Sequence, residues 1–294
     1  MRFKRFSMLT AVLVLLSIVL VGCSPVKSAW VATRVGTAIK RSPISETTGT
    51  LHGEIRGKTM GLDSKSALDF TFTSKMDDKN LESHTAVDTT VNVLGLDVKQ
   101  KFEVYTLKEG EESALYVHVK QPDLWARAAS SFDFSKLTNL DPALILMLAE
   151  RASSNAELTV VEENGVQIYE MSLTFQAKDL MQVLNTAGAR VPKEIKDLEL
   201  SEVSIPVILR VNGETFLPEG LSLEILGLTG PVLEGIFEAA GRDLGGVEIA
   251  EGSLTLQFTE FGYGQQQIPS LPAGAKDSAA SLLEIQKLFR ELFQ

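Results

Sequence analysis

The residue in this sequence best suited to covalent chemistry is Cys23, the only cysteine in 294 residues. It directly follows an apolar stretch, residues 8–22, and that stretch is preceded by the cations Arg2, Lys4 and Arg5. A cationic start, an apolar run of this length and small residues at its end are typical of a secretory signal peptide. A lone thiol in this setting is better explained as a nucleophile than as a buried apolar side chain.

The four residues Leu20-Val21-Gly22-Cys23 resemble the lipobox of bacterial lipoproteins. The resemblance implies transfer of a diacylglyceryl group to the Cys23 thiol, cleavage between Gly22 and Cys23, and often acylation of the new N-terminus. An uncleaved spanning helix is the alternative, but residues 8–22 are fewer than the ~20 that such a helix needs. The expected location is extracytoplasmic, with the covalent lipid at Cys23 anchoring the chain to the cell membrane, or to the outer membrane of a diderm host.

The other side chains that commonly perform chemistry form no recognisable motif. The three histidines are His52, His84 and His118, and none belongs to a close-spaced metal-binding pair. His84 and His118 fall on the polar side of alternating stretches, where we expect solvated side chains rather than zinc ligands. The sequence also lacks the Gly-x-Ser-x-Gly pattern of a serine nucleophile. We therefore expect no catalytic residue, no metal site and no cofactor, and we do not expect an enzyme.

The charge balance narrows the classes of partner. The chain carries 28 cations and 38 acids, which gives a net charge of −10. Removal of residues 1–22 takes away three cations and no acid, so the exported body has a net charge of −13. Because nucleic-acid binding needs clustered cations, we expect no nucleic-acid partner. Without another cysteine the body has no disulfide, so its stability must come from the burial of apolar side chains.

The segment that follows the expected cleavage site is basic. Within residues 23–45 every charged side chain is a cation: Lys27, Arg34, Lys40 and Arg41. Three apolar residues recur there at helical spacing: Val31, Val35 and Ile39. The spacing predicts a helix in this lipid-anchored segment. Each cation near an anionic lipid surface adds about 1 kcal/mol of attraction, although an ordinary packing helix with a solvated basic side is the favoured interpretation.

The dominant pattern in the rest of the chain is alternation of apolar and polar residues with a period of two. Such alternation predicts β-strands with one buried and one solvated face. The clearest examples lie in residues 68–72, 87–93, 115–120, 169–175, 203–211, 221–225 and 254–258. Glycine-containing turns at 107–113, 162–166 and 210–215 join several of them and favour antiparallel neighbours. We predict an α+β fold built on a large curved antiparallel sheet, a half-barrel of roughly nine to eleven strands.

Helical patterns interrupt the strands and are expected to pack on one face of the sheet. They lie at 139–153, 176–188 and 230–241, where proline or glycine marks an end. The amphipathic tail, residues 277–294, is expected to form a C-terminal helix. No linker rich in Ser and Gly divides the chain. Residues 46–276 are therefore predicted to form a single domain, preceded by the signal peptide, 1–22, and the basic segment, 23–45.

Three stretches carry a further resemblance: ALYVHVKQPDLWARA at 114–128, VQIYEMSLTFQAKDLMQVLN at 166–185 and YGQQQIPSLPAGA at 263–275. The chain resembles uncharacterised lipoproteins of Firmicutes and, more distantly, half-barrel lipoprotein carriers of the LolA, LolB, LppX and LprG type. The resemblance spans residues 27–276 and is one of overall pattern, so no binding residue is carried over. It implies an incomplete barrel whose concave apolar face, partly covered by helices, takes acyl chains.

Five phenylalanines are the candidate residues for an apolar pocket or core: Phe70, Phe72, Phe102, Phe175 and Phe258. The sequence leaves open whether they line a lipid-sized hollow or a core that the helices fill. The first alternative describes a non-enzymatic cell-envelope lipoprotein that binds or carries a lipid or acyl chain. The second describes a structural or partner-binding surface lipoprotein with a filled core and no ligand. No particular protein partner is predicted.

Overall fold

The computed structural model of the protein describes residues 24–77, 82–93, 95–109, 112–121, 123–129, 156–177, 200, 203–239, 247–264 and 267–281. Its strands are β1 (Ile44–Thr59), β2 (Leu62–Asp77), β3 (Glu82–Val93), β4 (Leu96–Glu109), β5 (Glu112–Val119), β6 (Leu124–Ala129), β7 (Glu157–Glu163), β8 (Val166–Gln176), β9 (Ser204–Asn212), β10 (Pro218–Thr229), β11 (Val247–Tyr263) and β12 (Ala280–Ser281). The helices of this part are α2 (Ser24–Arg41), α7 (Gly230–Ala239) and α8 (Ala275–Ser278).

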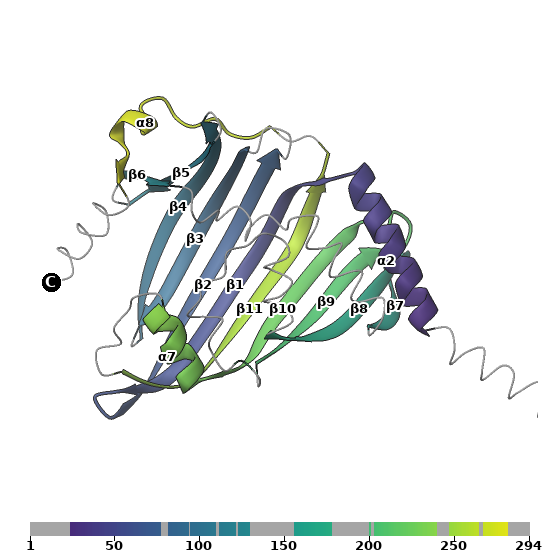
Figure 1. Ribbon diagram of the computed structural model, residues 1–294, viewed down its shortest axis with the longest axis horizontal. Coiled ribbons are helices and arrows are strands. Elements are labelled where there is room, and N and C mark those ends of the chain that lie inside the picture. The colour runs from purple at the N-terminus through teal and green to yellow at the C-terminus, as the bar shows by residue number, and fades with distance from the viewer. Residues whose placement is uncertain are drawn as a thin grey trace, which may run out of the picture.

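All the strands belong to one sheet, in the order β12-β6-β5-β4-β3-β2-β1-β11-β10-β9-β8-β7, and Figure 1 shows them side by side. Strands β1 to β11 pair with one another only in antiparallel fashion, whereas the two-residue β12 runs parallel to β6. Within the described residues the sheet is not closed, because β7 and β12 form its two edges. The predicted large antiparallel sheet is confirmed, with eleven antiparallel strands.

Strand β1 was missed by the sequence reasoning, although it lies at the centre of the sheet between β2 and β11. Its sequence, ISETTGTLHGEIRGKT, is polar and glycine-rich and shows no apolar alternation. Gly49 pairs with Phe72 on one side and with Phe258 on the other, and those two rings meet edge to face, with centroids 5.5 Å apart. The small residue lets two large neighbours cover the strand, an arrangement known to stabilise glycine in sheets.

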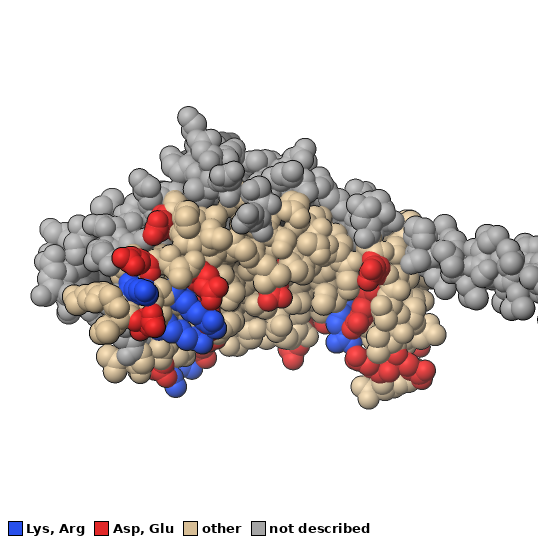
Figure 2. Space-filling model, turned by 90° about the horizontal axis from the view of Figure 1, so that it is seen from below, with Lys and Arg blue, Asp and Glu red and all other residues tan. Residues whose placement is uncertain are grey.

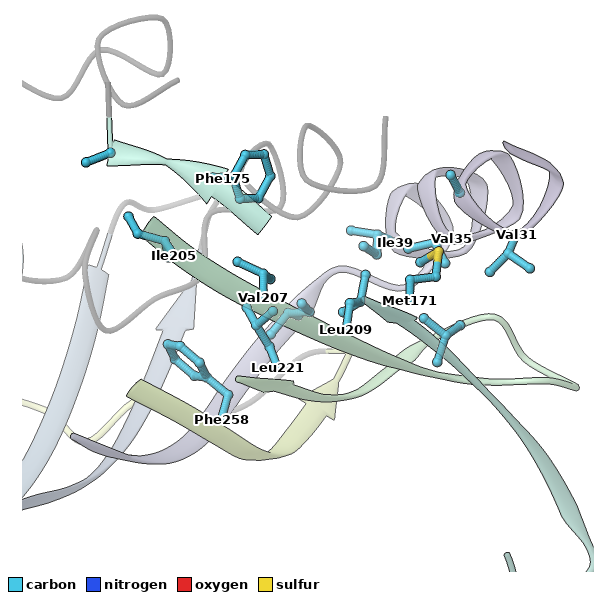
Figure 3. Close-up of a cluster of buried hydrophobic side chains, with 14 of the residues drawn as sticks. Val31, Val35, Ile39, Met171, Phe175, Ile205, Val207, Leu209, Leu221 and Phe258 are labelled. Atoms are coloured by element: carbon cyan, nitrogen blue, oxygen red, sulfur yellow. The ribbon is translucent and has the colours of Figure 1, made fainter. Parts of the chain in front are cut away.

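Many apolar residues of the sheet gather on one face, where helix α2 packs against β7, β8 and β9. Val31, Val35 and Ile39 of α2 are buried together with Met171 and Leu209, and Figure 3 shows these side chains pointing toward one another. Their spacing of four residues places them on one side of the helix. The same core continues along the sheet through a group of large side chains: Phe72, Phe175, Ile205, Val207, Leu221 and Phe258.

Helix α7 packs on the same sheet at another place. It contributes Val232 to the core, and the Leu233 side chain comes so near β11 that a methyl group on Gly252 would lie 2.8 Å from it. The helix covers most of the predicted range 230–241. The other two predicted helices, 139–153 and 176–188, lie outside the described residues apart from the end of β8 and Ala177. The described part of the chain is thus mostly β-structure with few helices.

The predicted C-terminal helix, 277–294, was misplaced at its start. Residues 277–278 end the short helix α8, Ala279 has an extended backbone, and Ala280–Ser281 form β12 beside β6. Pairing with the exposed edge of β6 outweighs the helical preference of these residues. Residues 282–294 lie outside the described part, as do Gly22, Cys23 and the rest of 1–23. Among the described helices none has the length and apolar character needed to cross a membrane.

Candidate functional site

The five predicted phenylalanines share the apolar face of the sheet, as the strand registers require. Phe72, Phe175 and Phe258 are buried in the main core, whereas Phe70 and Phe102 pack against it and stay partly exposed. The structure therefore places three of them in the core and two at its margin. Among the described residues, Phe70 and Phe102 are two of the partly buried apolar side chains that border this core.

The partly exposed margin extends along β2, β3 and β4. Phe70 and Phe102 meet edge to face across β3, with ring centroids 6.5 Å apart. One register step toward the β3–β4 turn, Leu68, Val91 and Val98 lie side by side on the same face. We call these five residues the apolar strip. Beyond it Leu96 and Leu62 are each 74% exposed, and Val98 is 57% exposed.

Exposed apolar residues are common on protein surfaces when they occur singly. Here Leu68, Val91 and Val98 are adjacent on neighbouring strands, and Phe70 joins them to the core. Thr89 and Gln100 lie on the same face between Val98 and Phe102. From Leu96 to Phe102 the strand rises about 20 Å at ~3.3 Å per residue. Burial of each methylene group of a ligand on such a surface gives about 0.8 kcal/mol. The strip is therefore elongated, and most of its side chains are apolar.

A buried hydroxyl group lies within the strip. Thr89 pairs with Phe70 on one side and with Gln100 on the other, and its side chain is buried. Among the described residues its Oγ1 atom has no hydrogen-bond partner. A buried hydroxyl without a partner is unfavourable, so Thr89 offers a bonding position for a polar group on a ligand. By contrast, the Ser74 and Thr85 hydroxyls of the same face are 2.9 Å apart and bond to each other.

The opposite, polar face carries a second, smaller core that sequence reasoning missed. Tyr105, Ala114 and Tyr116 are buried there, and Trp125 and Leu271 pack against them. Leu271 belongs to the segment 267–281, which contacts β4 to β6 through Leu271, Lys276 and Ala279. The sequence does carry a signal for this core. Three successive strands each have a large aromatic residue at a position that the alternation assigns to the polar face, and a sheet with a single buried face does not explain them.

Glu109 fixes the 267–281 segment to the polar face. Its carboxylate accepts hydrogen bonds from Lys276 Nζ at 2.6 Å, from Arg127 Nη2 at 2.8 Å and from the Tyr116 hydroxyl at 2.9 Å. The bonds from Lys276 and Tyr116 hold the pKa of Glu109 below its usual value. Burial, reinforced by the Glu109 carboxylate, raises the pKa of Tyr116. The cluster stays charged at neutral pH and serves as an attachment point for the segment.

The histidines of the polar face are less solvated than the sequence suggested. The His118 side chain is only 18% exposed, and its Nε2 lies 2.7 Å from an Asp123 carboxylate oxygen, so the prediction of a solvated side chain was wrong for this residue. His84 is half-buried against Tyr105, with ring centroids 4.6 Å apart, and burial lowers its pKa. The reason is the second aromatic core, which excludes water from this part of the polar face.

Tyr105 and Glu103 connect these histidines. The Tyr105 hydroxyl donates to Glu103 at 3.1 Å, and Lys120 Nζ lies 2.9 Å from the same carboxylate. Burial together with the neighbouring carboxylate raises the pKa of Tyr105 to about 12. Although burial alone would raise the pKa of Glu103, the bonds from Lys120 and Tyr105 lower it overall. In the part of the chain that the structure describes, no three His, Cys, Asp or Glu side chains are placed to hold a metal ion.

Three open hollows on the described part of the sheet are lined by charged residues, and two of them lie side by side. One, of about 490 Å³, lies at the end of the β1–β2 hairpin between Arg56, Lys58, Lys65 and Glu248. The other, of about 670 Å³, lies beside it on the polar face of β2 to β4. Figure 2, seen from below the view of Figure 1, shows cations and acids gathered together in two separate regions. Arg56 and Lys65 each contact Glu54 at 2.6 Å, so these cations are already paired.

The described sheet is open and antiparallel, and one of its faces is apolar and partly exposed. No family model matches the chain, and no curated protein matches it in sequence. Among solved structures the chain is similar to a DUF1329 family protein from Desulfovibrio piger, with a TM-score of 0.24, 14% identity, and coverage of 86% of this chain and 96% of that one.

A second similar structure is a beta-barrel-like protein of domain of unknown function DUF1849 from Brucella abortus. The TM-score is 0.23 at 10% identity, and the match covers 76% of this chain and 100% of that chain. Neither likeness assigns a function to this chain.

Proposed function

We propose that this chain is a non-enzymatic, lipid-anchored protein of the cell envelope that binds a hydrophobic ligand, a lipid or an acyl chain, on the apolar face of its sheet. The observation that carries the proposal is the apolar strip, where Phe70 and Phe102 continue the buried core but remain partly exposed.

The dimensions of the strip support an acyl chain as the ligand. The acyl chains of one membrane leaflet span ~15 Å, half of the hydrocarbon core. The stretch from Leu96 to Phe102 on β4 is about 20 Å long at ~3.3 Å per residue, so one chain can lie along it. The Thr89 hydroxyl, buried and unpartnered within the described residues, is suited to bond a carbonyl or hydroxyl group of that ligand.

The anchor proposed at Cys23 suits such a role. Helix α2 begins at Ser24, directly after the thiol, so the folded body follows the lipid without a long linker. Two or three acyl chains give stable residence at a membrane, whereas one chain is only marginal. A protein held in this way stays close to a source of lipid ligands.

The test is to purify the full chain from membranes in detergent, extract it with organic solvent and identify lipids that are not covalently attached. We expect a lipid to co-purify with the parent protein. The amount of bound lipid should be at least several-fold lower in the variant Val98→Asp. Val98 is already exposed, so the new charge can stay in water and the fold is retained.

The matched control is Lys99→Asp, the adjacent residue, whose side chain points to the polar face. It must retain the lipid. Absence of lipid from the parent protein, or equal loss in both variants, would contradict the proposal and favour the structural or partner-binding alternative.

A further inference from the structure

An aromatic cluster lies at the opposite edge of the sheet from α8. The ring of Trp30 on α2 meets that of Phe216 edge to face, with centroids 5.0 Å apart, and lies 6.4 Å from that of Tyr169. The Arg34 guanidinium lies over both rings, 5.5 Å from Trp30 and 5.8 Å from Phe216. Val160 of the edge strand β7 pairs with Tyr169. Trp30 is 46% exposed and Val160 is 49% exposed.

We call Trp30, Arg34, Val160 and Phe216 the edge patch. Phe216 has a backbone φ of 59°, a conformation that is unfavourable for a bulky residue. Its ring is nevertheless held in place by stacking on Tyr169 at 6.0 Å and by Trp30. The fold thus maintains a partly exposed aromatic ring on a strained turn. A small or polar residue would adopt this positive φ at a lower energetic cost. Strain of this kind is found preferentially at functional surfaces.

The edge patch lies where the anchored N-terminal chain reaches the body. Trp30 is seven residues after Cys23, and the described helix begins at Ser24, so Trp30 lies about 10 Å along the helix from its start at ~1.5 Å per residue. Ser28 Oγ donates to the Ala156 carbonyl just before β7, which fixes this end of α2 to the edge strand (Figure 1).

The outward side of α2 is basic and polar as well as aromatic. From Ser28 on, where its side chains are described, its exposed residues besides Trp30 are Thr33, Arg34, Thr37, Lys40 and Arg41, with no acid among them. Tryptophan rings favour the headgroup level of a bilayer, and cations favour its anionic lipids. Glu157, Glu162 and Glu163 of β7 and Glu214 in the β9–β10 turn are exposed nearby, so we expect apolar contact to contribute more than overall charge.

We propose that the edge patch rests on the lipid bilayer and sets the orientation of the body, with β7 toward the membrane and β6 away from it. This inference rests on the anchor of the proposed function but not on the ligand. It differs from simple tethering, because a tethered body without such a surface would tumble freely around its lipid.

The chain provides its own reporters. Its two tryptophans are Trp30, in the edge patch, and Trp125, on β6 near the other edge of the sheet. The experiment uses the full chain, purified from membranes and reconstituted into vesicles of phosphatidylethanolamine and phosphatidylglycerol with brominated acyl chains, which quench tryptophan by contact. The variant Trp125→Phe reports on Trp30, and Trp30→Phe reports on Trp125.

We expect brominated lipid to quench Trp30 emission by about half or more and to leave Trp125 nearly unchanged, as befits an indole at headgroup depth. In the Trp125→Phe background, Arg34→Glu should lower the quenched fraction about two-fold. The same charge reversal at Lys99, far from the edge patch, should have no effect.

The outcomes separate this inference from the anchor. Vesicle flotation with Trp30 quenching supports both. Flotation with an unquenched Trp30, or with equal quenching of both tryptophans, overturns the orientation and leaves the anchor intact. Protein that does not float with vesicles overturns both.

Discussion

The imidazole ring of His118 lies flat against the indole of Trp125, with ring centroids 4.2 Å apart and 3° between the planes. The two residues are register partners on β5 and β6, and Tyr105 adds a third ring 5.9 Å from Trp125. This stack joins the outer strands of the sheet on the polar face. These ring contacts explain why the polar face is stable at β5 and β6, although the main core lies on the other face of the sheet.

The first prediction concerns this stack. Trp125→Ala should lower the free energy of unfolding by about 2 kcal/mol, less than for a fully buried tryptophan because the ring is partly exposed. Urea denaturation followed by circular dichroism measures the change. Leu96→Ala, at a residue that is 74% exposed, serves as the control and should cost less than about 0.5 kcal/mol. Equal effects of the two substitutions would argue against a second core.

The second prediction is a loss of stability in mild acid. Burial lowers the pKa of His84 below its ordinary value of 6.5, so the unfolded chain takes up this proton first as the pH falls. The contribution of neutral His84 is complete above that value and is lost as the pH falls through the folded-state pKa. Glu103, whose pKa is also lowered, acts in the same direction but only below its ordinary value of 4.5.

Urea denaturation at about pH 7.5 and about pH 5.5 compares the stability above and below the ordinary pKa of histidine, at pH values where Glu103 does not yet contribute. The parent protein should be less stable at the lower pH, and His84→Gln should reduce that difference. A parent protein that gains stability on acidification in this range would contradict the assigned burial of His84.

The third prediction tests the close approach at the centre of the sheet. A Cβ atom on Gly49 would lie 2.5 Å from the Gln257 carbonyl oxygen and 2.6 Å from the Phe72 ring. Gly49→Ala should therefore cost about 2 kcal/mol of stability, since neither neighbour can move without disturbing the core. At Gly220 the nearest atoms are at 3.5 Å, and Gly220→Ala should be nearly neutral. Thermal unfolding of the two variants under one condition compares them directly.

The sequence predicted the sheet well where burial is one-sided. Leu68, Phe70 and Phe72 show the period of two that their single buried face imposes. The alternation did not reveal β1. Phe72 and Phe258 of the neighbouring strands cover the apolar face of β1, so its own residues there can be small. The alternation also failed for His118, because a second core on the polar face depends on which distant segment, here 267–281, covers that face. The parity of the five phenylalanines followed from the alternation, but their differing exposure depends on packing between strands that are far apart in the sequence.

The fourth prediction concerns the anchor. Labelled palmitate should enter the parent protein, and Cys23→Ala should abolish both the label and the cleavage before residue 23, so that intact mass includes residues 1–22. Cys23 is the only thiol of the chain, which makes the assignment unambiguous. Label that persists in the variant would show that lipid attaches elsewhere.

The most direct test of the central claim is to locate a bound acyl chain on the protein. The full chain is incubated with a fatty acid that carries a photoreactive diazirine near its methyl end, irradiated, digested and analysed by mass spectrometry. We expect saturable labelling of the peptides of β2 and β4 that carry Phe70, Val98 and Phe102, with competition by unlabelled fatty acid. Labelling on the polar face, or labelling without saturation and competition, would contradict the central claim.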